Sequence, residues 1–259
     1  MIACQCYTVF MSALILKIIA MITMTIDHIG EVFSMPSTYR MIGRIAFPLY
    51  ALMVIDGYRH IRHDSRRLER YAVFLLLAAV ISEPLHDLCF YGTFFSMEMQ
   101  NQILQFLIFI VTCVICERIG NKFVSVIIWL AVIYLNNRFA IGYFGAGIVF
   151  MLMLNWYLEL KERNDTWYLR LFLLLTVAVL TFGELFEQLY VQLYDLSRTM
   201  YYVQYYIKRG TVVLYTFLAF PFMAMYDGTY GNISPAFKII YRWYYPVHLL
   251  VLALIHRFL

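Results

Sequence analysis

The chain has 259 residues, of which 63% are hydrophobic and only 14% are charged, and its mean hydropathy is +0.72. A water-soluble domain of this length could not bury so many apolar side chains in one core, so the composition excludes a soluble fold and indicates a polytopic membrane protein. The net charge is only +4, and the basic residues gather in short loops, which argues against nucleic acid as a partner.

Apolar runs long enough to cross a bilayer follow one another along the chain. A spanning helix needs about 20 mostly apolar residues, and charged residues or clusters of Gly, Pro and Asn separate such runs. The runs cover residues 8–32, 41–58, 71–88, 102–117, 122–137, 141–158, 168–186, 210–226 and 239–258. We therefore predict an all-α fold, a polytopic transmembrane helix bundle of about nine spans (eight to ten), as a single domain over residues 1–259.

Two segments could change this count of spans: the first apolar run and the segment 187–208. The first run is expected to be retained, because its apolar stretch exceeds the roughly 7–15 residues of a signal-peptide core and its first cation is Lys17. The segment 187–208, "EQLYVQLYDLSRTMYYVQYYIK", is rich in Tyr and poor in aliphatic residues. It predicts either an interfacial helix or a tenth, poorer span.

The loop after the second span sets the expected orientation. It reads "YRHIRHDSRRLERY" and holds five arginines, and cytoplasmic loops are the ones enriched in Lys and Arg. Counting crossings from this loop puts the N-terminus and the loops 117–122 and 159–163 in the cytoplasm as well. The loop 86–100 has no Lys or Arg, as expected for the outside.

The first span carries three ionisable residues, Lys17, Asp27 and His28. Lys17 and His28 are eleven residues apart, so they lie within about 20° of one helix face and about 16 Å apart along the axis. Asp27 lies about 100° round from His28. Arg44, which enters the membrane from the same outer side, is the expected ion-pair partner of Asp27.

Further polar residues occur in other apolar runs: Glu83, His86, Asp87, Gln100, Asn101 and His248. Intramembrane ionisable residues ordinarily face a cavity or one another, so this number predicts a polar chamber between helices. The plainer alternatives remain open. His28 could be a buried imidazole satisfied by a carbonyl or hydroxyl, Lys17 could extend to the membrane surface, and the whole set could be a structural network.

The chemistry best suited to such a chamber is proton transfer by His28, since a neutral imidazole takes and returns protons near pH 7. It could activate an amine or hydroxyl to attack a thioester. No Ser or Cys lies beside it, and Thr25 is more typical of helix packing, so direct acyl transfer is favoured over a covalent enzyme intermediate. Lys17 would contact an anionic donor that enters from the cytoplasm.

Five cysteines are scattered along the chain. Cys113 and Cys116 form C-x-x-C inside the apolar run "QILQFLIFIVTCVIC", where packing or lipid contact is the expected role. The flanking sequence supplies no further thiol or imidazole ligand, so the sequence predicts no metal site.

Several of these segments resemble the signatures of the TraX family, named for the conjugative pilin acetylation protein. They are "LKIIAMITMTIDHIG", "IGRIAFPLYALMVIDGYRHIRH", "ISEPLHDLCFYGTFF", "QNQILQFLIF" and "YYPVHLLVLALI", in the same order from Leu16 to the C-terminus. The resemblance implies an integral protein of the bacterial inner membrane. It also implies acetyl transfer from acetyl-CoA to an exported or membrane-held acceptor, such as a pilin-like peptide or a glycan.

TraX proteins are in turn distantly similar to the acyltransferase 3 group, whose first helix carries a basic residue, ten intervening positions and a histidine. Lys17 and His28 have that spacing. The resemblance implies His28 and Asp27 as catalytic residues and Lys17 and Arg44 as donor contacts. It further implies four chamber or substrate residues without assigned roles: Glu83, Asp87, Asn101 and His248.

The chain departs from the family pattern in two places. Where relatives often carry an acidic D-Y-G segment in a middle span, this chain reads "FAIGYFGAGIVF" from Phe139, without an acid. Where relatives tend to have an Ile-Pro pair after the glutamate, this chain has Pro84-Leu85-His86, which leaves His86 as a feature of its own.

Two other classes of protein compete with the enzyme. A proton-coupled transporter or permease would also bury His, Asp, Glu and Arg, although the sequence has no detectable repeated halves. A structural or assembly subunit would use the polar residues only to hold helices together, and then no single one would be indispensable.

Overall fold

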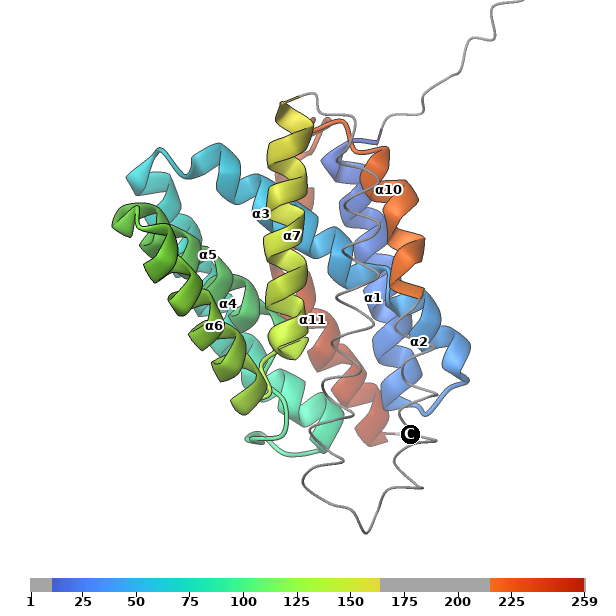
Figure 1. The fold of residues 1–259 in the computed structure, drawn as a ribbon. Coiled ribbons are helices and arrows are strands. Elements are labelled where there is room, and N and C mark those ends of the chain that lie inside the picture. The colour runs from blue at the N-terminus through green and yellow to red at the C-terminus, as the bar shows by residue number, and fades with distance from the viewer. Residues whose placement is uncertain (1–10, 164–214, 259) are drawn as a thin grey trace, which may run out of the picture.

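The computed structural model describes residues 11–163 and 215–258 of the chain. This part is a bundle of helices with no β-strand (Figure 1). The helices are α1 (Ala13–Val32), α2 (Ser37–Gly43), α3 (Ala46–Ile61), α4 (Ser65–Tyr91), α5 (Gln102–Ile119), α6 (Lys122–Arg138), α7 (Phe144–Glu162), the 3-10 helix η2 (Tyr215–Ala219), α10 (Phe220–Ala224) and α11 (Pro235–Phe258). The predicted all-α membrane bundle is confirmed.

The predicted count of about nine spans is not confirmed. Over the described ranges, five segments are long and apolar enough to cross a membrane: Ala13–Val32, Ser37–Ile61, Ser65–Tyr91, Gln102–Ile119 and Pro235–Phe258. α6 has only 17 residues, α7 ends in a charged turn, and residues 215–224 form two short helices. The expected span at 168–186 and the Tyr-rich segment 187–208 lie outside the described residues.

Several helix boundaries follow from local sequence. The side chains of Asp64, Asn101 and Asn121 each accept hydrogen bonds from two backbone N–H groups at the first turn of α4, α5 and α6. Gly92 and Gly120 end α4 and α5 with φ of 71° and 65°, a left-handed conformation that glycine adopts at low cost. These signals explain why the expected and observed boundaries of α5 and α6 agree closely.

The run predicted as one span over 41–58 is two helices that meet at Arg44 and Ile45. Pro48 has no N–H to donate to the carbonyl four residues before it, and its ring crowds that carbonyl, which belongs to Arg44. The helix therefore breaks there. The break places Arg44 at a helix junction, where its guanidinium reaches residues on other helices.

The helices are arranged around two apolar cores (Figure 1). α4, α5 and α6 lie side by side on one flank, and α1 and α2 lie on the other. The larger core is built mainly from α1, α3, α5 and α7, with Ala219, Phe220 and Met223 from the short helices. The smaller core joins α1, α4 and α11 through Val32, Cys89, Leu249, Leu252 and Ala253. This smaller core holds together the helices that carry the polar residues.

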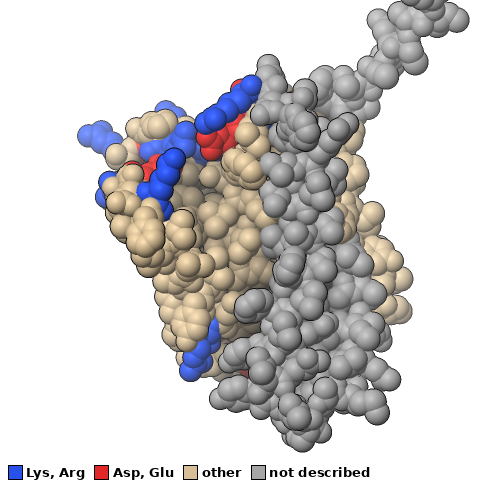
Figure 2. Space-filling model, in the orientation of Figure 1, with Lys and Arg blue, Asp and Glu red and all other residues tan. Residues whose placement is uncertain are grey.

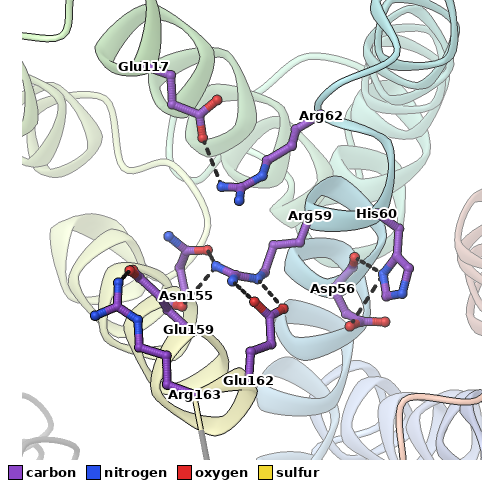
Figure 3. A network of polar contacts seen from close by, with 9 residues as sticks. All are labelled: Asp56, Arg59, His60, Arg62, Glu117, Asn155, Glu159, Glu162 and Arg163. Carbon is purple, nitrogen blue, oxygen red and sulfur yellow. Dashed lines mark hydrogen bonds and ion pairs between the residues drawn. The ribbon is translucent and has the colours of Figure 1, made fainter.

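Most of the charged side chains seen in Figure 2 gather at one end of the bundle, where basic groups predominate, and a smaller basic patch lies near the other end. Arg59 donates to Glu162 at 2.6 Å and to the Asn155 side chain at 3.1 Å, and Arg62 lies 3.4 Å from Glu117 (Figure 3). These pairs join α3, α5 and α7. We call this the basic end, formed by residues 56–70, 117–122 and 155–163. The three loops expected on one side of the membrane do share one end of the molecule.

The start of α1 also lies at the basic end. The backbone of Met11 pairs with that of Met225 at 2.8 Å, and the neighbouring Tyr226 donates its hydroxyl to Asp56 at 2.8 Å. Because α1 runs away from this end, Asp27 and His28 lie toward the opposite one. That far end consists of residues 33–44, 92–101 and 139–143, and its loops are joined by backbone hydrogen bonds of Gln100 with Ala140 and Gly142.

One fully buried side chain, that of Gln105, holds the loop 139–143 in place. Its amide nitrogen donates to Asn136 Oδ1 at 3.1 Å and to the carbonyls of Ile141 and Phe144 at 2.9 and 2.6 Å. Its oxygen accepts from the backbone N–H of Tyr143 at 3.1 Å. The loop also makes backbone hydrogen bonds with Gln100 and with residues 135–137, so the Gln105 side chain is one of several supports of its conformation.

We expect Gln105→Leu to destabilise the protein by at least about 1–3 kcal/mol, because it leaves buried backbone groups without partners. Thermal unfolding in detergent measures the effect. Gln102→Leu is the matched control, since Gln102 makes one side-chain bond, to Gln105 at 2.9 Å, and should cost less. An equal loss in both variants would contradict this role for Gln105.

Candidate functional site

Two histidines from opposite ends of the chain meet between α1 and α11. His28 Nδ1 lies 2.7 Å from His248 Nε2, and the two rings are stacked with centroids 4.9 Å apart and planes 15° from parallel. His248 is buried and His28 is partly buried. The structure thus brings together two of the predicted site residues that are 220 positions apart, and we call them the histidine pair.

The hydrogen bonds of the pair determine where its protons lie. His248 Nδ1 is 2.9 Å from the carbonyl oxygen of Tyr244, which can only accept, so this nitrogen must carry the proton. In a neutral ring the other nitrogen, Nε2, then accepts, and it accepts from His28 Nδ1. Nε2 of His28 is therefore left with a free lone pair. This chain of bonds therefore places the proton of a neutral His28 on Nδ1.

Aromatic side chains surround the histidine pair. Phe90 and Tyr245 meet the His28 ring edge-on, with centroids 5.1 and 6.2 Å away. The Tyr244 ring stacks on His248 at 5.2 Å, and its hydroxyl lies 2.6 Å from Thr25 Oγ1. The Thr25 hydroxyl also donates to the carbonyl of Met21 at 2.9 Å, as expected of a helix-packing residue. Rigid rings therefore fix the position of His28.

Asp27 faces away from the histidine pair, toward two arginines. Its Oδ2 is 3.0 Å from Arg40 and 3.7 Å from Arg44, and its side chain is only 10% exposed. Arg40 also bonds Glu31 at 3.0 Å. The expected contact with Arg44 is present, but Arg40, which sequence reasoning missed, lies nearer. In the described part of the chain no hydrogen bond or ion pair joins Asp27 to His28.

Glycine at position 43 allows this arrangement. A Cβ on Gly43 would overlap the side chain of Asp27, so only glycine lets the end of α2 approach α1 so closely. Arg44 follows directly and is buried. It donates to the hydroxyl of Tyr143 at 3.1 Å, and Tyr143 in turn stacks on Phe47 at 4.2 Å. The segment 139–150 therefore supplies a tyrosine to the cluster of Asp27 and Arg44.

The predicted chamber residues of α4 form a third group near the far end. Glu83 accepts from the backbone N–H of Asn101 at 3.1 Å and from its side-chain amide, which also donates to the carbonyl of Ala79 at 2.9 Å. Asp87 accepts from the backbone N–H of Ser96 at 2.7 Å. The structure brings Glu83, Asp87 and Asn101 together around the start of α5.

His86 belongs to this group as well. Its Nδ1 lies 3.3 Å from Asp87 Oδ1, and its ring contacts Phe90 with centroids 4.9 Å apart. Since Phe90 also contacts His28, one aromatic ring separates the histidine pair from the α4 group. His86 is thus buried beside the histidine pair and is not a surface residue.

Lys17 lies apart from these groups, toward the basic end of α1. Its ammonium group is 4.6 Å from the centre of the Tyr241 ring and 5.4 Å from that of Tyr230, so two aromatic faces hold it. The helix rise puts it about 16 Å from His28 along the axis. Lys17 and the histidine pair are therefore separate in the structure. This agrees with the spacing of about 16 Å that helix geometry predicts for Lys17 and His28.

Comparisons with known proteins agree with the order of segments noted in the sequence. The family model described as "TraX protein" matches residues 12–256. A curated protein of Dichelobacter nodosus, described as "Probable fimbrial assembly protein FimC, serogroup H1", is 32% identical over 81 residues. That match covers 29% of this chain and 32% of the relative, so the chain spans about a third of the length of that protein. No solved structure matches.

Proposed function

Since this chain belongs to the TraX family, we propose that it is a membrane-bound acetyltransferase that uses acetyl-CoA. The acceptor is an amine or hydroxyl of an exported or membrane-held molecule. The relative is described as a fimbrial assembly protein, which supports a pilus component, such as a pilin-like peptide, as the acceptor. A glycan, which would offer a hydroxyl group, is the alternative acceptor. Membrane lipid is the second proposed partner. The proposed location is the bacterial inner membrane, with the basic end facing the cytoplasm.

The observation that carries this proposal is the bond of 2.7 Å between His28 and His248. It leaves Nε2 of His28 as a base held in one orientation. In the proposed reaction this nitrogen takes the proton of the acceptor amine or hydroxyl as that group attacks the thioester carbonyl. A C–N or C–O bond forms, the C–S bond breaks, and His28 returns the proton to the departing CoA thiolate.

His248 acts through His28 and is a positioning residue. When His28 gains a proton, its Nδ1–H still donates to His248 Nε2, so the positive charge is stabilised without any movement of the rings. Asp27 was expected to act beside His28. Its contacts with Arg40 and Arg44 instead support a part in holding α2 against α1, next to the reacting group.

Lys17 and Arg44 are the proposed contacts of the donor. CoA is a long molecule with phosphates at one end and the thioester at the other, and Lys17 and His28 are separated by about 16 Å along one helix. The phosphates would lie near Lys17 at the basic end. The buried Nε of Arg44 has no hydrogen-bond partner among the described residues, so it can donate to a ligand oxygen near the reacting end.

The proposal is tested with the full chain purified in detergent and acetyl-CoA labelled in its acetyl group. One acceptor is a synthetic pilin peptide with a free N-terminal amine, and its control is the same peptide with that amine blocked. A free sugar tests the hydroxyl alternative. We expect label to pass to an unblocked acceptor and free CoA to appear in equal amount.

The result that would overturn the proposal is a folded protein that leaves acetyl-CoA intact with every acceptor and with water. If the same protein in vesicles carried a solute or protons across the membrane, it would be a transporter and not an enzyme.

A further inference from the structure

Three side chains on one turn of α4 offer metal ligands to the same point. Glu83, His86 and Asp87 occupy positions i, i+3 and i+4, which share one helix face. One ligand atom from each can be chosen so that all lie within 4.8 Å of one another. The pattern Glu-x-x-His on a helix is the one that carboxylate-bridged metal proteins use inside helical bundles.

The charge of this group is not balanced by a basic side chain. The side chains of His86 and Asp87 are only 8% and 1% exposed. Within residues 11–163 and 215–258, no Lys or Arg forms an ion pair with Glu83 or Asp87, whereas Asp27 has two arginines. Burying the Asp87 carboxylate beside the partly buried Glu83, with no Lys or Arg of the described residues paired to either, is costly. A bound cation of charge +2 would neutralise both.

The hydrogen bonds with Ser96 and Asn101 use one oxygen of each carboxylate and leave the other oxygen available for a metal ion. Asp87 Oδ2 is taken by the N–H of Ser96, and Glu83 Oε2 by Asn101. Glu83 Oε1 is buried and has no partner among the described residues. Bonds of this kind orient metal-binding carboxylates from behind. Of the two remaining oxygens, Asp87 Oδ1 lies 3.3 Å from His86 Nδ1.

The distance from His86 Nδ1 to Asp87 Oδ1 also favours a shared ion. At 3.3 Å it is longer than a strong charged hydrogen bond, which would measure about 2.7–2.9 Å. Two ligands each about 2.0–2.2 Å from one ion, at octahedral or tetrahedral angles, are separated by about 2.8–3.6 Å. The observed spacing falls in that interval.

We propose that Glu83, His86 and Asp87 bind one divalent transition-metal ion. One imidazole and two carboxylates suit ions such as Zn²⁺ or Mn²⁺. Ligands from a single helical turn occupy one side of the ion, so its other positions remain open to water or to an oxygen of a bound molecule. The ion would also fasten the loop 92–101 to α4 through Ser96. This inference does not depend on the acetyl-transfer proposal.

The test uses the full chain with a tag that contains no histidine, purified in detergent and stripped with EDTA. Co²⁺ is added as the probe because its visible absorption reports the ligands directly. We expect one tightly bound Co²⁺ per chain, displaced by Zn²⁺, and a higher melting temperature with metal than without. His86→Asn and Asp87→Asn should each weaken binding at least tenfold.

His60→Asn is the matched control, since His60 also lies beside a carboxylate, Asp56 at 3.6 Å, but is exposed at the basic end. It should leave the cobalt spectrum unchanged. Failure of the unmodified protein to bind Co²⁺ would overturn the proposal, whatever the variants do. So would a spectrum that survives Asp87→Asn, or one that is lost equally in His60→Asn.

Discussion

Replacing His28 by alanine should lower the rate of acetyl transfer by about 10²–10⁴-fold, the usual contribution of a general base. The loss should fall on kcat, because the residue acts on the proton that moves in the transition state and not on the binding of acetyl-CoA. Labelled acetyl transfer at saturating donor measures it. Among the described residues, the one basic side chain that hydrogen-bonds His28 is His248, which already accepts from it. No other contacting group could therefore replace His28 as the base.

Two further variants distinguish the role of His28 as the base from the role of His248 as its positioning residue. His248→Phe keeps the stacked ring but removes the acceptor for His28 Nδ1, so kcat should fall by less than in His28→Ala while KM for acetyl-CoA stays the same. His60→Ala, on the exposed end of α3, should leave both constants unchanged. Equal activity in His28→Ala and in the unmodified protein would remove the base from the mechanism.

The second large effect concerns the stability of the fold. Asp27→Ala should destabilise the protein by about 3–5 kcal/mol, the cost of leaving a buried charge without its partner. Arg44 would keep its positive charge with a side chain only 10% exposed, beside the like charge of Arg40. Unfolding by denaturant in detergent, followed by helix content, measures the difference.

Glu159→Ala provides the comparison for Asp27→Ala, because it also removes a carboxylate from an arginine. Its pair with Arg163 is exposed and lies within one helix, so it should cost about 0.3–0.5 kcal/mol. If the two variants were equally stable, the cluster around Asp27 would not be what holds α2 against α1.

The local signals in the sequence predicted much of the bundle, for reasons visible in the structure. Asn101 and Asn121 cap the helices that were expected to begin just after them, and Gly120 ends the helix before. These contacts lie within four residues of one another, so they can be recognised in a sequence. The break at Arg44 could have been anticipated too, since Pro48 stands four positions later.

The candidate site was predictable only in part. Asp27 and Arg44 were expected to meet because both sit at the same depth of adjacent spans, and they do. Arg40 lies in the short helix α2, which was not expected, so its bond to Asp27 was missed. Tyr143 was missed because its contact with Arg44 joins segments 99 positions apart, and nothing in its own segment indicates that contact.

The contact between His28 and His248 could not have been derived from either segment. Both were expected in one polar chamber, but the helical period gives only the face of each helix, not which two faces touch. That choice depends on the small core of α1, α4 and α11, which aligns the first helix with the last. The number of spans is not confirmed over the described residues for a related reason, since hydropathy alone does not distinguish a long span from short helices.

The most direct measurement is rescue of His28→Ala by free imidazole. If Nε2 of His28 is the base, a small imidazole that enters the space left by the ring should restore acetyl transfer in proportion to its concentration. Pyrrole, a ring of the same size without a basic nitrogen, should not. Restoration by both rings, or by neither while the variant is folded and still binds acetyl-CoA, would contradict the assignment of His28 as the proton acceptor.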